Sequence, residues 1–211
     1  MTTQAQIQAT LAYLLGENNT PTGALATTRE NFIQRTLEEI YRAYPWQFAG
    51  ATATLTFASG IATLPANFDY QHKLYAYFYN GDTQTGLEEI NFGDQDMYRD
   101  NDNRYWVEHI QNGVYKIVTK DTNYDTAVVK YQTVAPSLNA TTGTPFSDIS
   151  ALALGARRYV KIGENPDADI SQDEALFQKR LNESIAASQV NRPLKRHRKV
   201  YHANNYRLGD A

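Results

Sequence analysis

The side chains that could perform catalysis or bind a metal are few in this chain. Its 211 residues contain no cysteine, which excludes disulfides, thiolate metal sites and a cysteine nucleophile. No GxSxG, GxGxxG, Walker or HExxH pattern occurs. Two of the four histidines, His72 and His109, lie beside aromatic residues in predicted strands, and His197 and His202 match no common zinc spacing. We therefore expect a protein that is not an enzyme and has no catalytic residue, metal or cofactor.

A cluster of four aspartates suggests a calcium site. Asp94, Asp96, Asp100 and Asp102 place carboxylates at short intervals in the segment GDQDMYRDNDNRYW. Such oxygens suit Ca²⁺, but the segment lacks the central glycine and the twelfth-position glutamate of an EF-hand loop. We interpret it as a solvated loop between strands.

Charge is divided unevenly along the chain. The last twenty residues carry a formal charge of +5 and the preceding residues carry −8. The cations of this tail are Arg192, Lys195, Arg196, Arg198, Lys199 and Arg207. An acidic body repels nucleic acid, whereas a basic tail attracts phosphates or a groove lined with carboxylates.

Composition indicates a soluble globular protein. Hydrophobic residues make up 42% of the chain and aromatic residues 12%. No apolar run approaches the roughly 20 residues that span a bilayer, so we expect no contact with a membrane. The first twelve residues lack the basic start and apolar stretch of a secretory signal, and we expect them in the mature protein.

Four helices are predicted from apolar residues that recur every three to four positions. The first begins with the capping box Thr3–Gln6 and ends at Gly16; the second begins with the box Thr27–Glu30 and ends before Pro45. The third has its apolar face between Ile149 and Val160 and is closed by Gly163, and the fourth begins with a box formed by Ser171 and Glu174.

Between the second and third helices the apolar period changes from about 3.6 to 2, which indicates strands. A hairpin is expected in ATATLTFASGIATLP, where the ASG segment turns between 51–57 and 61–65. Further strands are expected at 72–79, 104–109, 113–120 and 126–134. The row formed by Tyr75, Tyr77 and Tyr79 fits either core packing or a subunit contact, and base stacking suits it less because the block is acidic.

We therefore expect an α+β fold. The N- and C-terminal helices would form an antiparallel bundle, with a small antiparallel β-sheet or sandwich inserted between them and an extended arm at the C-terminus. The expected divisions are N-terminal helices (1–45), a β-rich insertion (46–140), C-terminal helices (141–190) and a basic C-terminal arm (191–211).

The C-terminal arm (191–211) is too poor in apolar residues to form a core of its own. Its spaced apolar residues are Leu194, Val200, Tyr201, Tyr206 and Leu208. Apolar anchors interspersed among cations are typical of a peptide that lies in a partner's groove and folds on binding. A phosphate-contacting nucleic-acid arm and a merely solvated end are the alternatives.

The segment 40–78 resembles the head-to-tail connector, or adaptor, proteins of tailed bacteriophages. In that family a helix ends in a Trp-x-Phe segment, a hairpin follows, and a Leu-Pro-x-x-Phe/Tyr-Asp step leads to the next strand. The corresponding residues here are Trp46, Phe48, Gly60, Leu64, Pro65, Phe68 and Asp69, and the resemblance extends to VVKYQTVAPSL at 128–138.

This resemblance implies a structural protein of the virion, made in the host cytoplasm. Such adaptors form a ring, usually dodecameric, beneath the portal protein. The resemblance implies that the arm docks on the portal, that a downstream tail or stopper protein binds the other side, and that DNA passes through the lumen without sequence-specific binding. The alternative function is a nucleic-acid-binding module that uses residues 192–207 as its arm.

Overall fold

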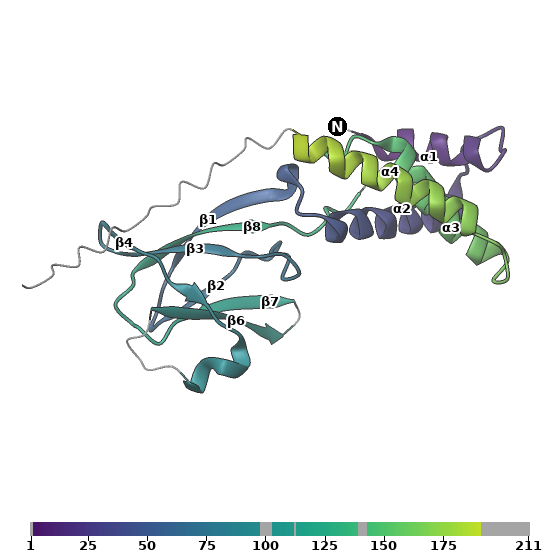
Figure 1. The fold of residues 1–211 in the computed structure, drawn as a ribbon. Helices are drawn as coiled ribbons and strands as arrows, with labels where there is room; N and C mark the ends of the chain where they lie inside the picture. The colour runs from purple at the N-terminus through teal and green to yellow at the C-terminus, as the bar shows by residue number, and fades with distance from the viewer. Residues whose placement is uncertain (1, 98–102, 112, 139–142, 191–211) are drawn as a thin grey trace, which may run out of the picture.

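The protein has a mixed α+β fold (Figure 1). The computed structural model describes residues 2–97, 103–111, 113–138 and 143–190. Within these residues the helices are α1 (Gln4–Leu14), α2 (Gly23–Ala43), α3 (Ile149–Glu164) and α4 (Ser171–Val190), with short 3-10 helices η1 (Gln47–Ala49) and η2 (Phe92–Met97). The strands are β1 (Gly50–Thr56), β2 (Ile61–Thr63), β3 (Tyr75–Asn80), β4 (Thr83–Thr85), β5 (Glu88–Glu89), β6 (Arg104–Gln111), β7 (Val114–Val118) and β8 (Thr126–Gln132).

Helix α3 lies at the centre of the helical part and contacts α1, α2 and α4. Its buried positions are largely small, including Ala151, Ala153 and Ala156, so the neighbouring helices can approach closely. The approach is closest at Gly155, where an added Cβ would lie 2.2 Å from Thr36 Cγ2 of α2. Helices α1 and α2 thus share one apolar core with α3 and α4.

The helix boundaries confirm part of the sequence prediction. The box at Thr3–Gln6 is present: the Thr3 N–H donates to Gln6 Oε1 over 2.9 Å, and the Gln6 N–H donates to Thr3 Oγ1 over 3.3 Å. Gly16 follows α1 in a left-handed conformation, with φ of 76°.

Three other predicted helix ends were wrong. Helix α2 begins a turn early, at Gly23, and the Thr27 hydroxyl donates to the Gly23 carbonyl as an interior residue would. Ser171 is the first residue of α4, and the Glu174 carboxylate binds Arg158 of α3 because a guanidinium is a stronger partner than a backbone N–H. Gly163 lies inside α3, which continues to Glu164.

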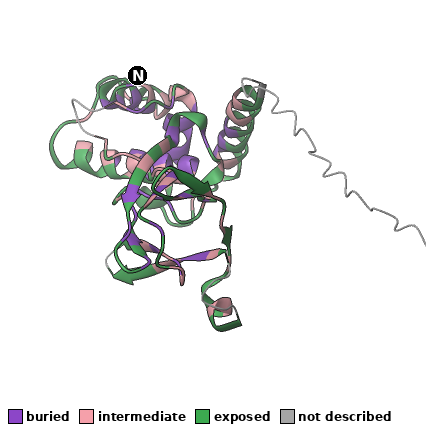
Figure 2. Cartoon of the chain, turned by 90° about the vertical axis from the view of Figure 1, so that its left-hand side faces the viewer, coloured by how far each residue is buried: buried purple, intermediate pink, exposed green. Residues whose placement is uncertain are grey.

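The strands form two small, mostly antiparallel sheets with the orders β1-β8-β3-β4 and β2-β7-β6-β5. Their inner faces contribute to a common apolar core that includes Leu55 and Phe78 from one sheet and Tyr105 and Ile117 from the other. Figure 2 shows buried residues concentrated in the helical part and between the strands. This core is separate from that of the helices.

The expected hairpin of 51–57 and 61–65 was wrong. β1 pairs with β8 and β2 pairs with β7, so the turn between them carries the chain from one sheet to the other. Ser59 and Gly60 both have positive φ, and a Cβ on Gly60 would lie 2.4 Å from the Thr119 carbonyl oxygen. Leu55 and Phe57 favour this crossing because it buries them between the sheets.

Other strand boundaries also differ from the prediction. β3 begins at Tyr75 and not at residue 72, because the His72 N–H donates to the Asp69 carbonyl in a turn over 3.3 Å. The short polar strands β4 and β5 were not expected. In the described part of the chain, none of the helices combines the length and apolar character needed to cross a membrane.

Candidate interaction surfaces

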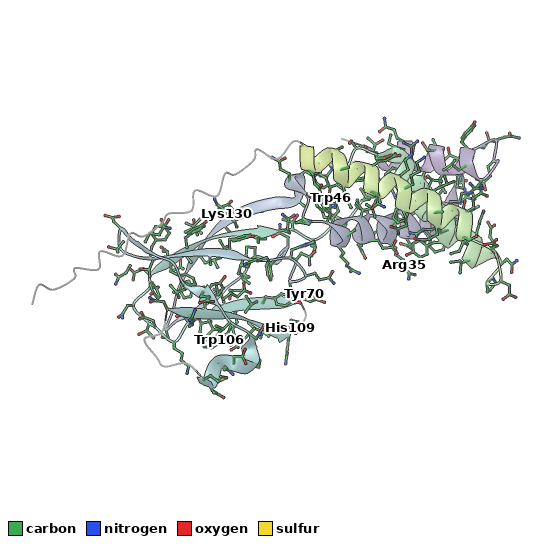
Figure 3. All side chains as sticks on the ribbon, in the orientation of Figure 1. Arg35, Trp46, Tyr70, Trp106, His109 and Lys130 are labelled. Carbon is green, nitrogen blue, oxygen red and sulfur yellow. The ribbon has the colours of Figure 1, made fainter. Side chains whose placement is uncertain are left out.

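Trp46 lies at the junction where the helices meet the sheets, as Figure 3 shows. Trp46 is only 2% exposed, and its indole N–H donates to the Ile40 carbonyl over 2.6 Å. Its ring stacks on Phe48 with centroids 5.4 Å apart and meets Phe146 edge-on at the same distance. Phe48 itself is 38% exposed.

Residues 64–72 connect the two sheets, which pack as a sandwich around their common core, to helix α2. Leu64 and Phe68 are buried in the sandwich core, Pro65 is half-buried, and the buried Asp69 donates its N–H to the Gln132 carbonyl over 2.9 Å. Nearby, His72 Nε2 lies 3.0 Å from the Tyr41 carbonyl oxygen at the end of α2. These residues therefore position the two parts of the fold, which is a structural task.

The outer face of the β1-β8-β3 layer is exposed and polar. The tyrosine row lies on it: Tyr75 is 55% exposed and Tyr77 37%, which excludes the core interpretation for this pair. Lys73 and Lys130 lie over the rings of Tyr75 and Tyr77, at 5.5 and 5.7 Å from the centroids. On β1 the same face presents Thr52, Thr54 and Thr56.

β1 is one of the two edge strands of this sheet, and the three-residue strand β4 is the other. Thr133 N–H donates to the Ala49 carbonyl and Phe57 N–H donates to the Asp125 carbonyl, each over 2.9 Å, and the pairing between them runs without a register shift. In an antiparallel ladder the hydrogen-bonded positions alternate, so the odd residues of β1 face β8. The backbone N–H and C=O groups of the three intervening threonines, Thr52, Thr54 and Thr56, therefore point away from the sheet.

The residues of β1 itself are not of the kinds that usually protect an edge strand from pairing. β1 has the sequence GATATLT, which contains no charged residue and no proline. Natural edge strands usually carry lysine, proline or a bulge, because a flat neutral edge pairs with other chains. The threonine alternation is visible in the sequence, but only the strand order shows that it lies at an edge.

Two grooves lie near the junction. The first, which we call the lysine groove, has a volume of about 460 Å³ and is lined by Lys73, Lys130, His72 and Tyr75; no carboxylate is among its described lining residues. The second, the Phe48 groove, has a volume of about 480 Å³ and lies between the aromatic junction and α4. Its lining residues are Trp46, Gln47, Phe48, Pro145, Phe146, Ser147, Ser184, Ala187 and Ser188.

Buried charges in the helical part are paired with one another. The guanidinium of Arg158, 8% exposed, binds Glu39 of α2 and Glu174 of α4 and lies over the Phe177 ring. Burial raises the pKa of Glu174, but hydrogen bonds from Gln178 and Arg158 outweigh it, so this pKa lies below its ordinary value. These contacts join α2, α3 and α4.

A second buried pair fixes the turn between α1 and α2. Arg29 is 2% exposed and binds both carboxylate oxygens of Glu17. Hydrogen bonding from this guanidinium lowers the pKa of Glu17. Both networks hold helices together.

The histidines and aspartates do not assemble a reactive site. His109 Nε2 accepts the Gly113 N–H over 3.3 Å, and its ring lies 5.0 Å from Tyr115, on which the exposed Tyr70 stacks. Asp94 and Asp96 lie in η2, where a loop was expected. Asp100 and Asp102, like His197 and His202, are outside the described residues. Within the described part of the chain, no group of three His, Cys, Asp or Glu side chains could hold a metal ion.

The expected docking arm lies wholly outside the described residues. It comprises Arg192, Leu194, Lys195, Arg196, Arg198, Lys199, Val200, Tyr201, Tyr206, Arg207 and Leu208. A scan against protein-family models and a search of curated proteins found no match to this chain.

Proposed function

We propose that this chain is a structural assembly protein without enzymatic activity: a head-to-tail connector of a tailed bacteriophage virion. In this proposal several copies form a ring, the helices make an antiparallel bundle, and the C-terminal arm extends onto the portal protein. A tail or stopper protein binds the opposite side, and DNA passes through the central channel.

The observation that carries the proposal is the open edge of β1. Its seven residues are uncharged, and three of them direct backbone donors and acceptors away from their own sheet. A protein that acted alone would be exposed to aggregation at such an edge. A neighbouring copy in a ring would satisfy these groups, and the adjoining threonines and tyrosines would supply further contact surface.

Charge supports a separate role for the arm. The arm is basic while the rest of the chain is acidic, so copies of the body do not attract DNA, and the arm favours an acidic groove on a different protein. An acidic body also suits a channel through which DNA must slide without being held.

Portal docking can be tested by co-elution of the full chain with the portal protein of the phage that encodes it. A variant in which Arg196, Arg198 and Lys199 are replaced by Gln should lose co-elution. The control variant replaces Lys179 and Arg180, two exposed cations of α4 outside the arm, by Gln. This variant should still co-elute with the portal protein. Equal co-elution of both variants would contradict docking through the arm.

A second candidate function, nucleic-acid binding, is favoured by the lysine groove. Lys73 and Lys130 line it together with Tyr75, and its described lining residues include no carboxylate. This function would require duplex or single-stranded DNA to bind with an affinity that falls steeply as salt rises. Weak, salt-insensitive binding of DNA by the full chain would exclude this second function. Portal co-elution of the same chain would then support the connector proposal.

A further inference from the structure

The two sides of the sandwich carry different charges. β1 and β2 lie at one side, because the chain passes directly from one to the other, and β5 is the edge strand at the opposite end of its sheet. Figure 1 shows β1 along the top of the sandwich and the short helix η2, which follows β5, at the bottom. The surfaces around β1 and around η2 therefore face opposite directions.

The first surface, which we call the β1 surface, consists of the β1 edge and the lysine groove. β1 has no charged residue, and the groove opens beside its first three residues, Gly50–Thr52. Lys130 lies on the next strand, directly opposite Thr52. Neither Lys130 nor Lys73 forms an ion pair within the described part of the chain. Lys73 shares a neighbouring groove with Glu89, so Lys130 is the cation left to attract a further carboxylate.

The opposite surface, which we call the acidic surface, has four carboxylates, on Glu88 and Glu89 of β5 and on Asp94 and Asp96 of η2. Glu88 already binds Arg104, but neither aspartate forms an ion pair among the residues that the structure describes. η2 also exposes Phe92 and Met97, by 55% and 79%. Free carboxylates beside exposed apolar side chains suit a protein contact.

β5 also offers free backbone groups. The Glu88 and Ile90 N–H groups donate to the carbonyls of Asn103 and Tyr105, each over 2.9 Å. Because hydrogen bonding alternates along a strand, the N–H and C=O groups of Glu89 point away from β6. The β1 surface and the acidic surface therefore both direct strand backbone groups away from their own sheets.

The symmetry of a ring selects between the possible partners of β1. Pairing of β1 with β1 of a second copy would use the same surface on both chains and would stop at two copies. A ring needs two different surfaces, so that each copy binds one neighbour with each. Acidic bodies repel one another, and a contact between a cationic and an acidic surface overcomes this repulsion.

We infer that the acidic surface of one copy docks on the β1 surface of the next, with Lys130 facing Asp94 and Asp96 of its neighbour. This inference rests on the proposed function, since it names the two surfaces that join in the ring. The contact has a direction, because every copy presents β1 to one neighbour and η2 to the other. Carboxylates of this same chain, and not phosphates of a nucleic acid, then occupy the lysine groove.

Charge reversal tests the inference in rings that the full chain forms alone or on portal particles. Lys130→Glu, and separately Asp94→Lys with Asp96→Lys, should each raise the concentration needed for ring formation about tenfold or more, because like charges then meet. A chain with all three substitutions restores opposite charges and should assemble within about threefold of the natural chain. The control Lys179→Glu reverses an exposed cation of α4 and should assemble normally; sedimentation velocity measures all four.

Two results would overturn the inference and leave the proposed function standing. One is that rings form equally well with either set of reversals, and the other is that the combined variant assembles no better than the worse of its two parents. A natural chain that forms no ring, alone or on portal particles, would contradict the proposed function and the inference together.

A measurement on the natural chain guards against misfolded variants. Zero-length carbodiimide coupling joins a lysine to a carboxylate only where the two side chains touch. Rings assembled from a mixture of isotope-labelled and unlabelled chains should yield isotopically mixed peptide pairs that join Lys130 to Asp94 or Asp96. Rings in which Lys130 is coupled only within its own chain, or to no carboxylate of the acidic surface, would overturn the inference.

Discussion

Arg158 is the residue on which the packing of three helices converges. Its side chain is almost fully buried, and its two carboxylate partners, Glu39 and Glu174, come from α2 and α4. The partners are roughly one-third exposed, so water relieves part of the cost of separating them. The network thus joins three helices, and loss of Arg158 removes the cation that both carboxylates share.

Replacing Arg158 by alanine should lower the free energy of unfolding by about 2–3 kcal/mol, since it removes the cation that Glu39 and Glu174 share and the contact with the Phe177 ring. Urea denaturation measures the change. The control Arg180→Ala removes an exposed pair with Glu183 and should cost less than about 0.5 kcal/mol. A similar loss of unfolding free energy in both variants would show that burial of the Arg158 network adds nothing to stability.

The pair of Glu17 and Arg29 makes stability depend on pH in the acid range. The folded-state pKa of Glu17 lies below its ordinary value of 4.5, so the stabilisation is complete above that value and is lost as pH falls through the folded pKa. Urea midpoints measured from pH 6 to about pH 3 should fall for the natural chain. In Glu17→Gln the midpoint at pH 6 should be lower and the acid-side decline smaller; an unchanged decline would refute the role of this pair.

At the scale of elements, the contact of α2 with α3 depends on a missing side chain. Gly155→Ala would normally strengthen a helix by up to about 1 kcal/mol. Here the new methyl group would overlap Thr36 Cγ2 and approach the Phe177 ring to 3.1 Å, so we expect a net loss of about 1–3 kcal/mol.

Thr36→Ser supplies the matched rescue for this prediction. It removes Cγ2 and keeps the hydroxyl that donates to the Phe32 carbonyl over 2.9 Å. The double variant should recover part of the stability in thermal or urea unfolding, and the Phe177 contact should prevent full recovery. A double variant no more stable than Gly155→Ala would show that the strain lies elsewhere.

The elements themselves were largely predictable because their signals are local. The helix period of Ile33, Leu37 and Ile40 and the capping box at Thr3 depend only on neighbouring residues, and both were confirmed. Strand partners depend on residues that are distant in the sequence. The pattern around β1 therefore predicted a hairpin with β2, whereas its partner is β8, far along the chain. For the same reason the sequence did not reveal that β1 is an edge.

The edge of β1 gives a prediction about assembly. Thr54→Pro removes a backbone N–H that points away from β8, so the internal ladder remains intact and the monomer should fold. Sedimentation should show loss of the ring. Thr54→Val keeps the N–H and should assemble normally; a ring formed equally well by the proline variant would place the subunit contact on another surface.

At the scale of the whole molecule, the distribution of charge along the sequence indicated one candidate site, the C-terminal arm. The basic arm could be found from Arg192 to Arg207 by counting charges. The two grooves could not, because each brings together residues that are far apart in the chain, such as Phe48 with Ala187 or Lys73 with Lys130. Trp46 and Phe68, two residues of the segment that resembles connector proteins, are buried at the junction and in the core between the sheets.

The central claim is that copies of this chain close into a ring that caps one end of the portal. Electron microscopy of the full chain mixed with portal particles tests it most directly. The account predicts portals that carry a single additional ring at one end, and a mixture made with the Gln-substituted arm should show separate rings and uncapped portals. Portals that remain bare with the natural chain, or that are capped equally by the substituted one, would contradict it.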